Sequence, residues 1–370
     1  MDLQALRADV PALAETVYLN TGASGPSPRH VVDAAREFLA YHEYEAPAGE
    51  GMYVAAEDVY VETRAAVADL LGATPAEIAL TQSTTDGINR VASAIDWAET
   101  ERVVRTDLEH AAGVLPWDRL ADQYGLEVEV LETRDGRLDL DDLTAAVTDA
   151  TLVTLSSITW THGTRLPVAE AVDVAHDAGA TVLVDAVQSP GQTPVDVREW
   201  GADFVAAAGH KWLLSPWGTG FLYVRDGVAD AFEPRQIGYR SVEGEGVTGY
   251  RYKPGAHRFE VGTTSPAPYV GLQASIETLT DIGLDAVEAR IRELTDYLKA
   301  ELGEERLLSP RRYESGLVTF EAADPDALVE RLAERGVQIR ALPSPRAVRA
   351  SVHAVNTRAD VDALLDALPE

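Results

Sequence analysis

Segments with the pattern of buried strands alternate with helical segments along the first two thirds of this chain. Mostly apolar runs that predict strands occupy residues 77–81, 102–106, 126–132, 151–156, 180–187, 203–208 and 220–224. Amphipathic helical patterns fall between them, for example over residues 84–94 and 168–179. Strands this uniformly apolar are buried on both faces, which is typical of a mostly parallel sheet covered by helices. The pattern therefore predicts an α/β layered domain.

The chain changes character near residue 266. Beyond it, helical patterns at 268–282, 284–302, 325–335 and 358–367 surround strand patterns at 317–322, 337–341 and 348–354. This layout is typical of a smaller α+β domain. We expect a large domain of residues 20–261 and a small domain made of residues 1–19 and 262–370. The Gly- and Glu-rich stretch 241–257 is expected to be a surface loop near the active site.

The charge balance and the cysteine count exclude several classes of function. The chain carries 61 acidic and 31 basic residues, a formal net charge of −30, and no cysteine. Such an acidic chain does not attract nucleic acid. The absence of cysteine excludes disulfides, thiolate metal sites and thiol nucleophiles, and we expect no metal site. Strong acidity with only three lysines is typical of proteins that work in high salt, so we expect a halophilic source.

No apolar run in the sequence approaches the roughly 20 residues that cross a bilayer. The N-terminus has neither the basic region nor the apolar core of a signal peptide. We therefore expect a soluble, cytoplasmic protein that does not bind membranes.

Lys211 is the first candidate functional residue. It follows the strand pattern 203–208 and His210, and it precedes an aromatic-rich turn that ends in Gly-Thr-Gly. Apolar neighbours such as Trp212 and Leu213 would lower its pKa and make the amine nucleophilic. The alternative is an ordinary lysine in a solvated loop. Because lysine is so scarce in this chain, we favour a functional role.

Two further features lie where α/β sheets bind ligands. Asp185 ends the strand sequence TVLVD, at the carboxyl edge of the predicted sheet. A carboxylate there either caps the next segment or keeps the nitrogen of a bound ring protonated. The hydroxyl-rich turn that contains Thr84 opens the helix 84–94. It is either a simple cap or a phosphate site formed by backbone N–H groups and the helix dipole.

His110 and Arg349 complete the set of candidates. His110 follows the strand pattern 102–106, and its ring would either stack on an aromatic cofactor or hydrogen-bond a loop. Arg349 lies in an apolar strand pattern and needs an anion. That anion would be either a substrate carboxylate or one of the chain's many acidic side chains.

In order and spacing, these five features resemble the class V aminotransferases of the fold-type I pyridoxal-phosphate superfamily. That group contains cysteine desulfurases, selenocysteine lyases and isopenicillin N epimerase-like proteins. The resemblance runs from YLNTGASGPSP at residues 18–28 to VRASVHAVNTRADVDALLDAL at residues 348–368. It implies a large domain that binds pyridoxal 5'-phosphate on a mostly parallel sheet, and a smaller α+β C-terminal domain.

The resemblance also implies roles around the cofactor ring. Lys211 would hold the cofactor as a Schiff base, and Asp185 would pair with the pyridine nitrogen. Gln188 would donate to the phenolic oxygen of the cofactor, and His110 would stack on the ring. The catalytic residues would be Lys211, Asp185 and His110.

Contacts to the phosphate and the substrate are implied in the same way. Thr84, Thr85 and His210 would hold the phosphate. Thr263 would reach the phosphate of the neighbouring subunit, which implies an obligate homodimer with shared active sites. Arg349 would bind the α-carboxylate of a small amino-acid substrate.

The chain departs from the family's pattern at three places. Desulfurases carry a nucleophilic cysteine on a loop that corresponds to residues 342–348. Here this loop is short and has no cysteine, so sulfur transfer through an enzyme persulfide is chemically impossible. Ala208 stands where relatives often have a phosphate-binding serine, and Trp160 replaces an asparagine near the cofactor oxygen. The candidate residues of the substrate pocket are Trp160, Tyr239, Arg240 and Arg340.

The reaction stays open at this point. Our first prediction is a class V aminotransferase that acts on a small amino acid through an external aldimine. The alternatives are a cysteine or selenocysteine lyase-like β-elimination without an enzyme persulfide, and an epimerase. All of these reactions begin by removing a proton from Cα. A non-catalytic protein that binds pyridoxal phosphate agrees least with the complete set of residues.

Overall fold

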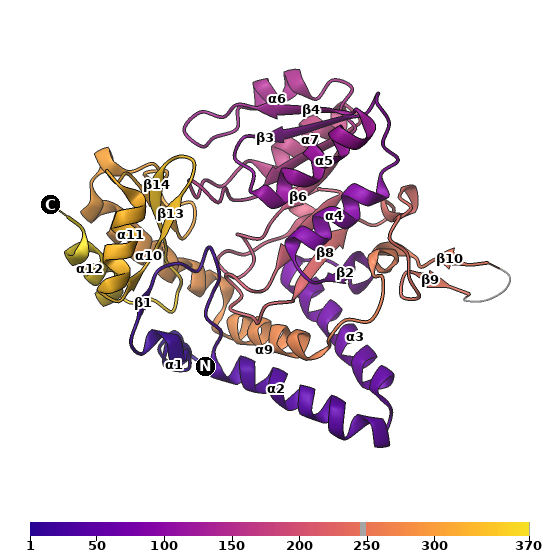
Figure 1. The fold of residues 1–370 in the computed structure, drawn as a ribbon, viewed down its shortest axis with the longest axis horizontal. Coiled ribbons are helices and arrows are strands. Elements are labelled where there is room, and N and C mark those ends of the chain that lie inside the picture. Colours follow the sequence, from indigo (N-terminus) through magenta and orange to yellow (C-terminus); the bar gives the residue numbers. More distant parts are fainter. Residues whose placement is uncertain (245–248, 370) are drawn as a thin grey trace.

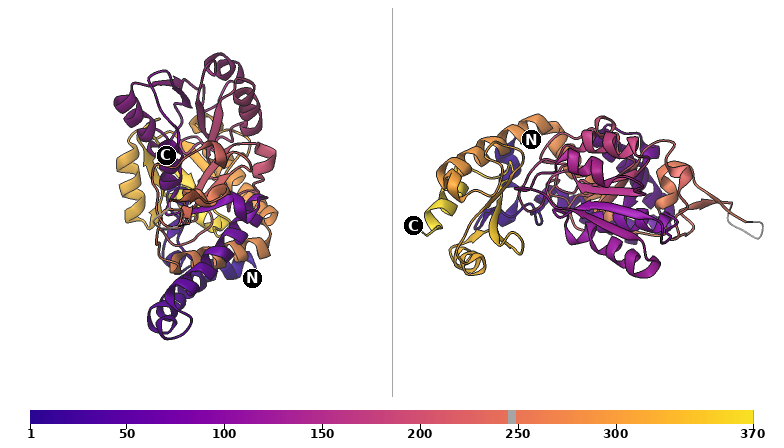
Figure 2. Two further views of the ribbon diagram at one scale, coloured as in Figure 1. Left: turned by 90° about the vertical axis from the view of Figure 1, so that its right-hand side faces the viewer. Right: turned by 90° about the horizontal axis from the view of Figure 1, so that it is seen from above.

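The computed structural model describes residues 1–244 and 249–369 (Figure 1). A large central sheet with helices on both faces forms most of the molecule, and a smaller sheet with its own helices lies at one end (Figures 1 and 2). Among the described residues, no helix is both long and apolar enough to cross a membrane.

The central sheet has seven strands in the order β2-β8-β7-β6-β5-β3-β4. β8 runs antiparallel to both of its neighbours, and the other neighbouring pairs run parallel. This confirms the predicted mostly parallel sheet, and all seven predicted strands are present. The strands are β2 (Ile78–Thr81), β3 (Arg102–Thr106), β4 (Glu127–Leu131), β5 (Leu152–Ser156), β6 (Thr181–Asp185), β7 (Phe204–Ala208) and β8 (Gly220–Val224).

Successive residues of each central strand face opposite helical layers. On β6, Val182 and Val184 belong to a core shared with α3 and α7, whereas Leu183 belongs to a core shared with α4 and α5. Asp185 therefore faces the layer that contains α4 and α5. The helices of this part are α1 (Leu3–Ala8), α2 (Arg29–Tyr44), α3 (Met52–Leu71), α4 (Thr84–Ala94), α5 (Leu115–Tyr124), α6 (Leu140–Ala146), α7 (Val168–Asp177) and α8 (Val197–Trp200).

The smaller sheet has the order β11-β14-β13 and is antiparallel. A separate apolar core lies between one face of it and helices that include α10, α11 and α12. These elements are β11 (Leu317–Phe320), β13 (Arg340–Leu342), β14 (Ala347–Ser351), α10 (Leu284–Leu302), α11 (Pro325–Glu334) and α12 (Arg358–Ala367). The loop between β13 and β14 is as short as the sequence predicts.

The N-terminal segment contacts this smaller unit. β1 (Val17–Tyr18) pairs in parallel with β12 (Val337–Gln338). The prediction of a single strand at 337–341 is therefore wrong. The first half of this stretch pairs with β1, and the second half pairs with β14. α9 (Ala267–Ile282) packs against α2 and α3 and contributes to the core of the central sheet. The domain boundaries at residues 19/20 and 261/262 stay a prediction.

The stretch 241–257 contains an antiparallel pair, β9 (Val242–Glu243) and β10 (Arg251–Tyr252). Residues 245–248 of this stretch lie outside the described residues. The pair projects from the surface at the end of the molecule opposite the small sheet (Figures 1 and 2). Within one chain it therefore lies away from the strand of Arg349. The surface location agrees with the prediction, and the predicted proximity to the active site stays a prediction.

Candidate active site

The turn between β7 and β8 places Lys211 at the carboxyl end of β7. Trp212 and Leu213 are fully buried and anchor this turn, while Lys211 itself is half-buried. Desolvation lowers the pKa of Lys211 to about 8; the carboxylate of Asp185 opposes this shift, and the guanidinium of Arg349 adds to it. An amine with this pKa is partly unprotonated near neutral pH, as a nucleophile requires.

Asp185 is the last residue of β6 and is buried. Its Oδ1 accepts a hydrogen bond from Val187 N at 3.0 Å, and Oδ2 has no hydrogen-bond partner among the described residues. Burial raises the pKa of Asp185, while the hydrogen bond from Val187 and the charge of Lys211 oppose the rise. A buried carboxylate with one free oxygen is suited to accept a hydrogen bond from a cationic N–H group.

The N-terminus of α4 lies beside the end of β7. Thr81 and Ala208, the last residues of β2 and β7, are both Cα partners of Gly220 at the start of β8. Ser83 caps α4 through its side chain. Thr84, the first residue of the helix, is buried, and its Oγ1 has no hydrogen-bond partner in the described part of the chain. An unpaired hydroxyl at a helix N-terminus is well placed to bind a phosphate.

His110 follows β3 and lies against Trp160. Its Nδ1 accepts a hydrogen bond from Ala112 N at 3.2 Å, and its ring meets the Trp160 ring edge-on, with the centroids 5.2 Å apart. Desolvation and the charge of Lys211 lower the pKa of His110 to about 4, and Arg340 and Arg349 act in the same direction. The imidazole is therefore neutral near pH 7 and can stack on an aromatic ring without a charge of its own.

Glu109 is a buried carboxyl that the sequence analysis missed. Its Oε1 accepts from Thr106 Oγ1 at 2.6 Å and from Ser156 N at 3.1 Å, and its Oε2 accepts from Ser156 Oγ at 2.7 Å. Ser156 is the Cα partner of Asp185 on the neighbouring strand. Burial raises the pKa of Glu109 to about 7 against these hydrogen bonds, and the charge of Asp185 adds to the rise. Perturbed carboxyls grouped in this way are typical of active sites.

Arg349 lies in the central strand of the small sheet and is only 1% exposed. Its Nη1 donates to Trp160 O at 2.5 Å, while Nε and Nη2 have no partner among the described residues. Burial, and then the charge of Arg340, lowers the pKa of Arg349 to about 9. A buried guanidinium with unpaired donors requires an anion.

A segment of small residues, 20–25, lies between Lys211 and Arg349, and its residues were not among the predicted site residues. A Cβ at Gly22 would lie 3.2 Å from Arg349 Nη2, and a Cβ at Gly25 would overlap the carbonyl oxygen of Lys211. Glycine at these positions allows the backbone to approach both residues. The sequence signal is the density of small residues in TGASGPSP.

Gln188 is buried beside this segment. Its Nε2 donates to Gly22 O at 3.0 Å, and its Oε1 accepts from Trp212 Nε1 at 2.7 Å. The amide therefore has one N–H group left for another acceptor. The role of Gln188 at the phenolic oxygen of the cofactor stays a prediction.

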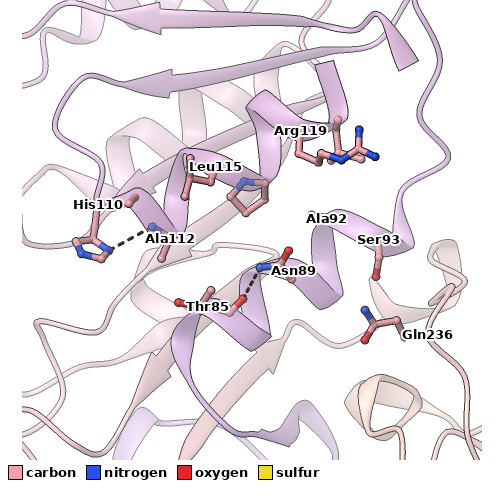
Figure 3. Close-up of a pocket in the computed structure, with 12 residues that line it drawn as sticks. Thr85, Asn89, Ala92, Ser93, His110, Ala112, Leu115, Arg119 and Gln236 are labelled. Atoms are coloured by element: carbon pink, nitrogen blue, oxygen red, sulfur yellow. Dashed lines mark hydrogen bonds between the residues drawn. The ribbon is translucent and has the colours of Figure 1, made fainter. Parts of the chain in front are cut away.

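A pocket of about 480 Å³ extends between α4 and α5 (Figure 3). Thr85 and His110 line one part of it, and Arg119 and Gln236 line another. The residues around it do not include Lys211. Two predicted site residues, Thr85 and His110, therefore line this pocket, but Lys211 does not.

The structure places His210 next to Lys211 and Thr263 on the surface. The rings of His210 and Trp217 lie 5.6 Å apart, and desolvation together with the charge of Lys211 lowers the pKa of His210 to about 4. Thr263 is exposed, and its Oγ1 lies 2.6 Å from Tyr239 Oη. Their phosphate contacts stay predictions.

The other candidate pocket residues divide into two kinds. Trp160 and Arg340 lie at the site, with the Arg340 guanidinium 5.7 Å from the centre of the Trp160 ring. Arg240 is instead part of an ion-pair cluster, 2.8 Å from Glu57 and 3.3 Å from Glu260. The prediction that Arg240 lines the substrate pocket stays a prediction.

The residues present fit pyridoxal phosphate. Lys211 supplies an amine of lowered pKa, and Asp185 supplies a free carboxylate oxygen. The unpaired hydroxyl of Thr84 at the N-terminus of α4 suits the phosphate. The unpaired donors of Arg349 remain for the substrate.

Comparisons with known proteins identify the family of this chain. The family model described as Aminotransferase class-V matches residues 17–364. The chain belongs to the class V aminotransferase family. Its members use pyridoxal phosphate, so this class V protein is a pyridoxal-phosphate-dependent transferase or lyase with the fold-type I architecture.

Similar proteins of this family are cysteine desulfurases and a cystine lyase. A probable cysteine desulfurase of Pyrococcus abyssi is 32% identical, and the match covers 99% of this chain and 96% of the relative. The apo structure of a cysteine desulfurase from Thermococcus onnurineus has a TM-score of 0.90 at 31% identity, covering 98% and 96% of the two chains. The cystine C–S lyase C-DES, solved with its product cysteine persulfide, has a TM-score of 0.91 at 26% identity and coverages of 96% and 98%.

Proposed function

We propose that this class V protein is a β-lyase, which breaks the bond between Cβ and a leaving group of a small amino acid without using a protein thiol. The observation that carries the proposal is the absence of cysteine in a chain similar over its whole length to cysteine desulfurases and to a cystine C–S lyase. A desulfurase that stores sulfur on its own cysteine needs a residue that this chain lacks. A lyase that releases the leaving group directly does not.

Lys211 has two tasks in this reaction. Its Nζ would hold the cofactor covalently, and the free amine would take up the proton from the substrate Cα. When bound, pyridoxal phosphate withdraws electrons from Cα and so makes this proton acidic. The lowered pKa of Lys211, about 8, keeps a useful fraction of the amine unprotonated near neutral pH.

Asp185 and Arg349 position the reacting groups. The free Oδ2 of Asp185 would accept a hydrogen bond from the ring nitrogen of the cofactor and stabilise its protonated form. The unpaired Nε and Nη2 of Arg349 bind the α-carboxylate and orient the Cα–H bond toward Lys211. Trp160 fixes Arg349 from the other side through its carbonyl oxygen.

Phosphate binding and the homodimer belong to the same proposal. Thr84, Thr85 and His210 would bind the phosphate within one chain. Thr263 is exposed, so its proposed partner is the phosphate of a neighbouring subunit. Thr263→Ala should then weaken cofactor binding in a homodimer, and sedimentation equilibrium should show a dimer. A monomer with full cofactor affinity would contradict shared sites.

The experiment that tests the reaction combines trapping and product analysis. Borohydride reduction of the holoenzyme followed by peptide mass spectrometry should locate the cofactor on Lys211. Lys211→Ala should lose this adduct, and the control Lys253→Ala should keep it. Incubation with L-cystine should release pyruvate repeatedly. Stoichiometric conversion to pyridoxamine phosphate, restored by a keto acid, would instead identify an aminotransferase.

A further inference from the structure

Two arginines occupy one face of the small sheet. On β14, Val348 and Ala350 point into the small apolar core, so Arg349 between them points to the opposite face. Arg340 on β13 is the direct Cα partner of Arg349. Directly opposed residues on antiparallel strands have their side chains on the same face of the sheet. Both guanidiniums therefore face the Trp160 loop.

Neither guanidinium has a carboxylate partner within the described ranges. Arg349 donates only to a carbonyl oxygen, and Arg340, half-buried, only lies over the ring of Trp160. The chain has about two acidic residues for each basic one, so acidic partners are abundant. The other buried arginines do pair with carboxylates: Arg64 with Glu260, Arg90 with Asp86 and Arg258 with Asp230.

This arrangement is unfavourable unless anions are bound. Like charges directly opposite each other on neighbouring strands destabilise a sheet, and a buried charge without a partner does so as well. One α-carboxylate can compensate Arg349 but leaves Arg340 without an anion. A ligand with two anionic groups a few bonds apart would compensate both, because opposed Cα atoms lie only about 4.5–5.5 Å apart.

We propose that Arg340 is a specificity-determining residue that binds a second anionic group on the substrate, so that the preferred substrates are amino acids with an acidic side chain or a second carboxylate. The proposal rests on the proposed function for the place of the α-carboxylate at Arg349. Trp160 holds the Arg340 side chain in place through the face of its ring without neutralising its charge.

The test is calorimetric binding of two compounds that lack an amine and therefore do not react. Succinate carries two carboxylates, and butyrate carries one. In the holoenzyme, Arg340→Gln should weaken succinate binding by about 10–100-fold, the range for losing a charge-assisted hydrogen bond, and change butyrate binding by less than about threefold. Arg349→Gln should weaken both. Arg340→Lys should keep much of the succinate affinity because the positive charge remains.

Arg346→Gln is the matched control, since it removes the same charge from an exposed residue of the neighbouring turn. It should change neither affinity by more than about threefold. Unchanged succinate binding in Arg340→Gln would overturn the proposal. Equal weakening of succinate and butyrate would also overturn it, because Arg340 would then serve the α-carboxylate.

Substrate assays identify the chemical source of the second anion. L-Cystine and S-carboxymethyl-L-cysteine carry a carboxylate beyond the sulfur, and S-sulfo-L-cysteine carries a sulfonate; L-cysteine and S-methyl-L-cysteine are the neutral comparisons, and each of these compounds has a sulfur leaving group on Cβ. Arg340→Gln should lower kcat/KM for the acidic substrate that the enzyme prefers and spare the neutral ones. Selective succinate binding without pyruvate release would refute the proposed reaction and leave the anion site standing. Pyruvate release that Arg340→Gln leaves equally efficient for acidic and neutral substrates would overturn the anion site and leave the proposed reaction standing.

Discussion

Replacing Glu109 with glutamine should remove a pH-dependent loss of stability. The folded protein raises the pKa of Glu109 from 4.5 to about 7, chiefly by burial. Between these values the folded state keeps a proton that the unfolded state has lost, so stability falls as pH rises from about 4.5 to about 7 and is constant above. A pKa difference of this size corresponds to about 3 kcal/mol.

Glutamine reproduces the protonated form of this side chain. Its carbonyl oxygen can accept from Thr106 Oγ1 and Ser156 N, and its amide nitrogen can donate to Ser156 Oγ in place of the carboxyl proton. Glu109→Gln should therefore be close to wild type near pH 5 and more stable at about pH 8.5. Roughly 2–3 kcal/mol of this difference in the free energy of unfolding develops between pH 5 and pH 8.5. In a chain of 370 residues this corresponds to roughly 3 °C in Tm.

The assay is scanning calorimetry of wild type and variant across this pH range at one salt concentration. Glu77→Gln is a control of opposite sign. Burial opposes ionisation of Glu77, but hydrogen bonds from Thr74 and the charge of Arg198 outweigh it and hold the pKa of Glu77 below its usual range. That variant should lose stability at high pH, and the loss should shrink in acid. An equal Tm difference for Glu109→Gln at pH 5 and pH 8.5 would refute the reasoning.

Three further predictions use the same stability measurements. Because the net charge is −30, added KCl should raise Tm by screening repulsion, and undiminished stability in dilute buffer would contradict adaptation to high salt. Gly25→Ala should lower the free energy of unfolding by about 1–3 kcal/mol and lower cofactor occupancy, because its Cβ would overlap the carbonyl oxygen of Lys211. A variant with normal cofactor absorbance and the wild-type Tm would argue against this close approach. Glu260→Ala should lower the free energy of unfolding in urea by about 3–5 kcal/mol, because it removes the buried carboxylate 2.8 Å from the buried Arg64 and leaves only the half-exposed Glu57, 3.7 Å away.

The central sheet could be predicted because each of its strands is a local signal. Strand β6, for example, is a run of apolar residues that ends in a carboxylate, and this pattern needs no knowledge of its neighbours. The split between β12 and β13 could not be predicted in this way. It depends on β1 pairing with Val337 from the other end of the chain, and pairing partners so distant leave no local pattern.

The site residues likewise divide into those with a local sequence signal and those that depend on distant partners. Lys211 and Asp185 were found because their residue type and their place after a strand are both informative. Glu109 was missed because Ser156, which hydrogen-bonds its carboxyl group in the folded chain, lies 47 positions away in the sequence. From the sequence alone, an acidic residue beside His110 looks like part of a solvated turn. Arg340 appeared only as a candidate pocket residue, because its opposition to Arg349 is a property of sheet register.

The pKa values of the site restrict which group can move protons in the proposed β-lyase. Desolvation and the charge of Lys211 lower the pKa values of His110 and His210 to about 4, so both imidazoles are mostly neutral near pH 7. Glu109 titrates near pH 7 but is buried and bonded to Ser156. Lys211, with a pKa of about 8, is the described group at the site that both gains and loses a proton in this range. We infer that the amine that takes the proton from Cα also returns it to the leaving group, so that no cysteine is needed to carry the sulfur away.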